Sequence, residues 1–261
     1  MNEAGPSNEG LQQAIRAAGG VTELARRIGI SQPSISNWSR VPAERVLAVE
    51  AATGVGRAVL RPDLYAEDCG ALDETESARA REYALLAHLL TQAPDAATLA
   101  KLTRLGGDAT PLGAAHRTLA DAASLTDAAA LERAHFELFV GVGRGELVPY
   151  ASFYLTGFLH DRPLARLRAD LAELGIERAE ERCEPEDHAG TLCEIMAGLI
   201  GGPFRVSTDI QKTMFDKHLA PWIGRFFADL EASETARFYA RLGTVGRIFI
   251  DIEKQAFALP A

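Results

Sequence analysis

Residues 184–196, EPEDHAGTLCEIM, decide the fold, because they predict a helix that enters a hydrophobic core. Pro185 suits the first turn of a helix, where its missing N–H removes no hydrogen bond. The acidic residues that follow stand where the helix dipole favours negative charge. The apolar residues then share one helical face: Ala189, Leu192, Ile195, Met196 and Leu199. We therefore predict a buried helix over 186–199, with Asp187 and His188 near its entrance.

A second stretch belongs with the first one. Residues 136–140, FELFV, end a helical pattern, and a glycine-rich loop follows at 141–148. The segment 149–154, PYASFY, then leads into another helix.

Helical spacing continues through most of the chain after residue 79. Residues 248–252 would suit a strand if they were taken alone, but the pattern on both sides favours a helix. The sequence therefore predicts an all-α protein, with helices near 79–90, 94–105, 112–123, 127–140, 152–159, 163–174, 186–199, 207–231 and 233–257.

The N-terminal quarter has the spacing of a helix-turn-helix in residues 21–38, VTELARRIGISQPSISNW. Ala25 is small enough for two helices to cross closely. Gly29 supports the tight turn between them, where φ is positive in many structures. Ile35 and Trp38 anchor the second helix on the first. In this motif the second helix enters the major groove of DNA.

The neighbouring residues extend this pattern. Ser31 can cap the second helix and Pro33 suits its first turn, while VPAERV at 41–46 and RPDLY at 61–65 follow. Residues 9–66 resemble the YdaS-type branch of Cro/repressor helix-turn-helix proteins. This resemblance implies sequence-specific DNA binding, with base-edge contacts from Gln32, Ser34, Ser36 and Asn37 and phosphate contacts from Arg26, Arg27 and Arg40.

Residues 79–257 resemble the TorD/DmsD family of chaperones for redox enzymes. The resemblance rests on an aromatic–Leu–Phe helix end, a Pro-aromatic-x-Ser-x-Tyr segment, and Glu-Pro-x-Asp-His followed by Glu and Met. It implies an all-helical domain that binds the signal peptide or precursor of a molybdenum-containing enzyme. One departure is His135, where family members often carry Trp. The implied peptide-binding residues are Leu138, Phe139, Pro149, Pro185, Asp187 and His188.

The composition is that of an ordinary soluble protein of one or two domains, with 261 residues, 47% hydrophobic and 24% charged. No apolar run is long enough for a transmembrane helix, and the N-terminus lacks the pattern of a secretory signal. The three cysteines, Cys69, Cys183 and Cys193, form no CxxC pair and leave an odd count. We therefore expect neither a disulfide framework nor a zinc site, and a cytoplasmic location.

The net charge of −9 is unevenly distributed. Residues 1–65 hold seven arginines and six acidic side chains, whereas the rest of the chain holds 20 basic and 30 acidic ones. The acidic part is a poor partner for nucleic acid and a better partner for a cationic peptide. The nearly neutral N-terminal quarter leaves DNA binding open.

These patterns predict a helix-turn-helix domain at 1–66, a linker at 67–78 and a TorD-like domain at 79–261. The main hypothesis is a chaperone that holds the precursor of a molybdoenzyme through its twin-arginine signal peptide. The alternative is a transcription regulator in which the TorD-like domain senses that peptide. A homodimer is open in both cases.

Several patterns have plainer explanations. Leu138, Phe139 and Pro149 could be core residues, and Asp187 with His188 could be an ordinary helix start. Residues 141–145, GVGRG, hint at a phosphate loop, but they follow a helix and no GxxxxGK[ST] is present. No catalytic triad, paired-carboxylate site or metal cluster stands out, so we predict neither enzymatic activity nor a cofactor.

Overall fold

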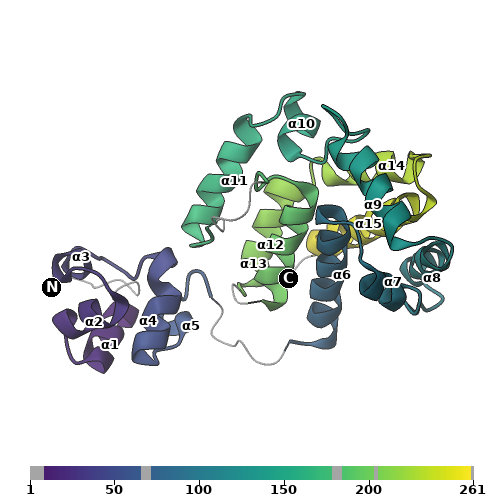
Figure 1. Cartoon of the computed structure of the whole chain (residues 1–261). Helices are drawn as coiled ribbons and strands as arrows, with labels where there is room; N and C mark the ends of the chain where they lie inside the picture. Colours follow the sequence, from purple (N-terminus) through teal and green to yellow (C-terminus); the bar gives the residue numbers. More distant parts are fainter. Residues whose placement is uncertain (1–8, 66–71, 178–183, 203–204, 260–261) are drawn as a thin grey trace.

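The computed structural model describes residues 9–65, 72–177, 184–202 and 205–259, and these residues form helices and connecting turns (Figure 1). Within these ranges there is no strand, and an isolated antiparallel bridge joins Tyr150 to His188. The predicted all-α fold class is therefore confirmed. Within the same ranges, no helix is both long enough and apolar enough to cross a lipid bilayer.

The N-terminal helices form the predicted helix-turn-helix. Gly29 ends the first helix of the motif in the left-handed conformation, with a φ of 72°, and Pro33 lies in the first turn of the second helix. Ile35 is 1% exposed and holds the second helix on the first. The elements are α1 (Glu9–Ala18), α2 (Val21–Ile28), α3 (Gln32–Ser36), the 3-10 turn η1 (Ala43–Arg45), α4 (Val46–Thr53) and α5 (Arg57–Leu60).

The remaining helices make up a larger group, which we call the body. Within the body α6 packs against α12, and α15 packs against α14 and α8. The elements are α6 (Glu74–Thr91), α7 (Ala96–Leu102), α8 (Pro111–Ser124), α9 (Ala128–His135), the π-helical turn η2 (Phe136–Val140), α10 (Ala151–Thr156), α11 (Arg162–Glu173), α12 (Ala189–Gly201), α13 (Thr208–Met214), the π-helical turn η3 (Phe215–Leu219), α14 (Ile223–Ala232) and α15 (Arg237–Ala258).

A buried ion pair joins α6 to α15 inside the body. The Arg79 guanidinium donates to both carboxylate oxygens of Glu253, over 2.7 and 2.8 Å. The Tyr83 hydroxyl donates to the same carboxylate over 3.1 Å, and Arg79 also donates to the Gln211 side-chain oxygen over 3.2 Å. Because Glu253 is only 1% exposed, these contacts take the place of its hydration shell.

Two predicted helix starts differ from the structure. The helix predicted to begin at 186 begins at Ala189, because His188 is its N-cap and Pro185 lies in the turn before it. The helix α6 begins at Glu74, inside the predicted linker, because Asp73 forms a capping box with Glu76. Residues 67–71 of that linker, like Cys69 and Cys183, lie outside the described residues.

The helix predicted over 207–231 is divided into α13, η3 and α14. The turn η3 closes wider backbone hydrogen bonds, and Pro221 behind it has no N–H to continue a helix. The helix predicted over 127–140 likewise ends in the π-helical turn η2. Turns of this kind are frequent at functional sites. Residues 248–252 lie inside α15, so the helical interpretation of that stretch is confirmed.

One end of α11 lies against the helix-turn-helix group. Gly175, which follows α11 with a φ of 69°, approaches Ala43 of η1 so closely that a Cβ there would lie 2.5 Å from the Ala43 carbonyl carbon. The glycine therefore permits both the turn after α11 and this contact between the two groups.

Candidate functional site

The two motif stretches of the sequence meet in space. Residues 149–151 run antiparallel to 187–189, and two backbone hydrogen bonds join them. The Ala189 N–H donates to the Pro149 carbonyl over 2.7 Å, and the Ala151 N–H donates to the Asp187 carbonyl over 2.9 Å. The structure thus brings together Pro149, Pro185, Asp187 and His188, although 35 residues separate the two stretches.

Asp187 is buried, at 1% exposure, and its two carboxylate oxygens differ. Oδ2 accepts the Ser152 N–H over 2.8 Å, which places negative charge at the start of α10, where the helix dipole favours it. Oδ1 has no hydrogen-bond partner among the described residues, and neither has the Ser152 hydroxyl. A buried charged oxygen without a donor is costly, so the hydrogen-bonding capacity of Oδ1 is left unused by the described residues.

His188 holds the start of α12. Its Nδ1 accepts the Gly190 N–H over 3.1 Å, and the backbone N–H of His188 donates to the Pro185 carbonyl over 3.2 Å. The ring packs edge-on against Tyr150, whose hydroxyl donates to Glu184. Burial lowers the pKa of His188 to about 4. The ring is therefore neutral at pH 7, as its role as a hydrogen-bond acceptor at Nδ1 requires.

Asp187 lines a cavity of about 400 Å³ that lies between α10, α11, α12 and η3. Polar and charged side chains reach this cavity from two elements: α11 contributes Arg166 and Asp170, and η3 contributes Lys217 and His218. We call this cavity the Asp187 pocket. Its other lining residues are largely apolar, and they are Ala151, Leu155, Pro163, Leu167, Ala169 and Leu192.

Most charges in the Asp187 pocket are balanced internally. Asp170 accepts hydrogen bonds from His218 Nε2 over 2.7 Å and from Lys217 Nζ over 3.2 Å. Burial acts to raise the pKa of Asp170, but these two hydrogen bonds outweigh it and lower the pKa, so the carboxylate is charged and offsets Lys217. Arg166 is exposed to solvent, whereas Asp187 is buried. The pocket therefore favours a ligand that brings a cationic donor.

The Leu138 and Phe139 side chains lie elsewhere. Leu138 is fully buried, and Phe139 is half-buried with its ring 5.0 Å from that of His135. Neither residue lines the Asp187 pocket. The apolar residues of η2 that face solvent are Phe136 and Val140, at 45% and 53% exposure, and they line a second cavity of about 670 Å³.

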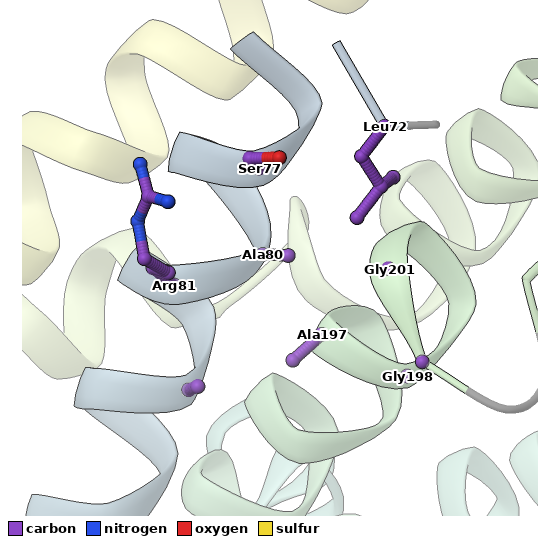
Figure 2. Close-up of a pocket in the computed structure, with 9 residues that line it drawn as sticks. Leu72, Ser77, Ala80, Arg81, Ala197, Gly198 and Gly201 are labelled. Carbon is purple, nitrogen blue, oxygen red and sulfur yellow. The ribbon is translucent and has the colours of Figure 1, made fainter. Parts of the chain in front are cut away.

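A third cavity, of about 420 Å³, lies between α6 and α12 and is drawn in Figure 2. Its lining is mostly Ala and Gly. Figure 2 shows the Leu72 side chain directed toward the gap beside Gly201, and a Cβ on Gly201 would lie 2.9 Å from Leu72 Cδ1. The polar lining side chains are Ser77 and Arg81, and no buried polar atom without a partner lies among its described lining residues. We interpret this cavity as a packing gap where Leu72 anchors the chain.

The predicted base-contacting residues lie on the surface of the helix-turn-helix group. Gln32, Ser34, Ser36 and Asn37 are all exposed on or directly after α3. The Gln32 amide donates to the Ser36 hydroxyl over 2.9 Å, and the Ser34 hydroxyl shares a hydrogen bond of 2.7 Å with that of Ser31.

The predicted phosphate-contacting arginines are in surface ion pairs. Arg26 and Arg27 both donate to Glu23, over 2.7 and 3.1 Å, and their hydrogen bonds lower the pKa of Glu23 to about 2. Arg40 donates to Asp63 over 3.0 Å. Surface pairs contribute about 0–1 kcal/mol each, so a phosphate group can replace these carboxylates at little expense.

Sequence reasoning found the two motif stretches but not the charged residues that complete the Asp187 pocket. Asp170, Lys217 and His218 stand in unremarkable amphipathic helices, and the contact between them depends on how α11 packs against η3. No local pattern could have indicated this contact.

Both resemblances noted from the sequence are confirmed by comparison with known families. Residues 11–69 match the family described as bacterial toxin YdaS, and residues 106–228 match the family described as nitrate reductase delta subunit.

Curated relatives point in the same direction. The chain is 30% identical over 110 residues to chaperone protein YcdY of Escherichia coli (strain K12), covering 42% of this chain and 55% of that protein. It is 24% identical over 127 residues to chaperone protein TorD of Vibrio cholerae serotype O1, covering 45% of this chain and 58% of that protein. The chain thus spans a little over half the length of the relatives it matches.

Proposed function

We propose that the body acts in the cytoplasm as a maturation chaperone that binds the twin-arginine signal peptide or precursor of a molybdenum-containing redox enzyme. The nitrate reductase delta subunit match and the relatives named as chaperones support this proposal. The observation that carries it is the carboxylate of Asp187, which is buried, lines a cavity and has one oxygen without a partner among the described residues.

The chemistry of the peptide suits this carboxylate. A twin-arginine signal peptide presents two guanidinium groups, and each of them offers several N–H donors in one plane. A hydrogen bond to a charged group contributes about 1.5–3 kcal/mol, more than a neutral one. The excess of acidic side chains after residue 65 also attracts a cationic segment over a longer range. One arginine therefore enters the Asp187 pocket and donates to Asp187 Oδ1.

The proposal is tested by titration calorimetry of the full chain with a synthetic twin-arginine signal peptide. The substitution Asp187→Asn keeps the shape and removes the charge, so it should weaken binding by about 1–3 kcal/mol, less at high salt. The matched control is Asp121→Asn, an exposed carboxylate on α8, which should change little. Equal affinities for the wild type and Asp187→Asn would contradict the proposal.

A second variant tests whether the Asp187 pocket binds a cationic ligand or an anionic one. Arg166 is a positive charge at the edge of the Asp187 pocket, so Arg166→Gln should tighten the binding of a cationic peptide. If that variant weakened peptide binding, the pocket would instead be a site where Arg166 and Lys217 receive an anion.

We infer a second function, DNA binding, from the exposed polar residues of α3 and the YdaS match. In gel shifts with duplexes from its own upstream region, the full chain should bind with a marked dependence on salt. The variant Gln32→Ala should relax sequence preference, whereas Arg27→Ala should weaken all duplexes alike. The absence of any shift at low salt would rule this function out.

The two functions can be coupled through α11. This helix lines the Asp187 pocket with residues between Pro163 and Asp170, and it also contacts η1 of the helix-turn-helix group, which Gly175 approaches closely. This contact favours the regulator alternative, in which peptide binding alters DNA affinity. Measuring DNA affinity with and without saturating peptide tests it, and equal affinities would leave two independent functions.

A further inference from the structure

An exposed apolar patch borders the turn between α10 and α11. Leu155 at the end of α10 is 40% exposed, and Phe158 and Leu159 in the turn are 72% and 48% exposed. Figure 1 shows α10 and α11 meeting at this turn. We call these three residues the apolar rim. Solvent-facing apolar side chains that gather in this way mark interaction surfaces more often than single exposed ones do.

The turn holds these side chains outward. Gly157 ends α10 in the left-handed conformation, with a φ of 83°. The Thr156 hydroxyl accepts the Phe158 N–H over 3.3 Å, and Asp161 caps α11 by accepting the Arg162 N–H over 2.6 Å. The exposure of Phe158 therefore follows from a hydrogen-bonded turn.

The apolar rim and the Asp187 pocket share one residue. Leu155 belongs to both, because it is part of the rim and also lines the pocket beside Asp187. A peptide whose arginine reaches Asp187 must leave the pocket past one of its walls. In a signal peptide, the residues directly after the arginines begin the apolar segment. These residues need an apolar surface within a few residues' reach, at about 3.3–3.6 Å per extended residue.

We propose that the apolar rim binds the first part of the apolar segment of the same signal peptide whose arginine occupies the Asp187 pocket. This inference rests on the proposed function and adds a binding surface to it. The rim lies outside the residues implied by the sequence motifs, of which Leu138 is fully buried. Burying one aromatic side chain against such a segment changes affinity by roughly tenfold or more.

The rival surface is the cavity beside η2. Phe136 and Val140 are exposed there, but the acidic side chains that line this cavity are Asp95, which caps α7, and Glu132. None of its described lining residues has a buried polar atom without a partner. An apolar segment bound there would have no adjacent buried carboxylate for the preceding arginine.

The test uses the full chain and two synthetic peptides in titration calorimetry. One peptide carries two arginines followed by an apolar segment, and the other carries the same arginines followed by serines. The rim variant is Phe158→Ala combined with Leu159→Ala, and the matched control is Phe136→Ala on η2. The rim variant should bind the apolar peptide about tenfold more weakly and the serine peptide as the wild type does, while Phe136→Ala should bind both normally.

Two results would overturn the inference: an unchanged affinity of the rim variant for the apolar peptide, or a loss that appears with Phe136→Ala instead. The variant Asp187→Asn distinguishes this failure from that of the proposed function. If Asp187→Asn weakens both peptides while the rim variant weakens neither, the proposed function stands and the rim inference falls. If the wild type binds neither peptide, both fall. Because Phe136, Phe158 and Leu159 are exposed to solvent, circular dichroism should show an unchanged fold for the rim variant and for Phe136→Ala.

Discussion

Two carboxylates of the body, Glu253 on α15 and Asp187 before α12, are both 1% exposed but have different surroundings. Both oxygens of Glu253 accept hydrogen bonds from Arg79, and the Tyr83 hydroxyl adds a further one. The Asp187 carboxylate accepts one hydrogen bond, at Oδ2 from the backbone N–H of Ser152. Its Oδ1 has no partner among the described residues.

The difference separates a structural charge from a functional one. Glu253 is satisfied within the chain, so its hydrogen bonds hold α6 to α15 and leave nothing for a ligand. An unsatisfied buried acceptor instead lowers stability by about 1–3 kcal/mol, which a ligand that donates to it can offset. The buried carboxylate without a full set of donors is therefore the better indication of a binding site.

The largest expected effect is the loss of stability from Glu253→Ala. Removing one member of a buried ion pair leaves Arg79 uncompensated, so the free energy of unfolding should fall by about 3–5 kcal/mol. Urea denaturation measures it. The matched control is Asp251→Ala, an exposed carboxylate on the same helix, which should change stability by less than about 0.5 kcal/mol. Similar losses for the two variants would show that the pair at Glu253 does not join the helices.

His188 should make stability depend on pH. Its pKa is lowered from 6.5 to about 4 by burial, so in this range the unfolded chain binds a proton that the folded chain does not. Neutral His188 therefore makes its full contribution to the free energy of unfolding above about pH 6.5. That free energy falls by roughly 3 kcal/mol as the pH is lowered from 6.5 to 4. Protonation at Nδ1 would also remove the acceptor for the Gly190 N–H.

The control for this pH effect is His188→Asn, because Asn also caps helices but does not titrate. Between pH 6.5 and 4, the variant should lose less stability than the wild type when both are unfolded with urea. Parallel stability curves for the two proteins would mean that other groups account for the acid sensitivity.

The smallest expected effect on stability is at Glu23. This residue pairs with Arg26 and Arg27 on the surface, where solvent screens the charges, so Glu23→Gln should barely change the free energy of unfolding. The same substitution releases two arginines for phosphate contacts and should tighten DNA binding at low salt. Weaker DNA binding by Glu23→Gln would instead mean that Glu23 orients these arginines for DNA.

The sequence was sufficient to predict the helices where local chemistry determines them. Gly29 predicted the turn of the helix-turn-helix, and the apolar spacing of 186–199 predicted the buried face of α12. The capping-box spacing of Asp73 and Glu76 also indicates the start of α6, although the small and acidic residues around it favour a linker. Local patterns could not predict the start of α12, because residues 187–189 pair with a segment about 35 residues away.

The candidate site was predictable only in part, for the same reason. The motifs indicated Asp187 and His188. The neighbouring sequence does not show that one carboxylate oxygen of Asp187 lacks a hydrogen-bond partner, or that His188 caps a helix. The charge balance of the pocket depends on Asp170 and Lys217, which meet only in the folded chain.

The most direct test of the central claim is a double-mutant cycle between Asp187 and the arginines of the signal peptide. The wild type and Asp187→Asn are each titrated with the twin-arginine peptide and with versions in which one arginine is citrulline, which has nearly the same shape but no charge. If a guanidinium donates to Asp187 Oδ1, the two changes should be coupled by about 1 kcal/mol or more at one of the two arginines. Additive effects at both arginines, within about 0.3–0.5 kcal/mol, would contradict the account.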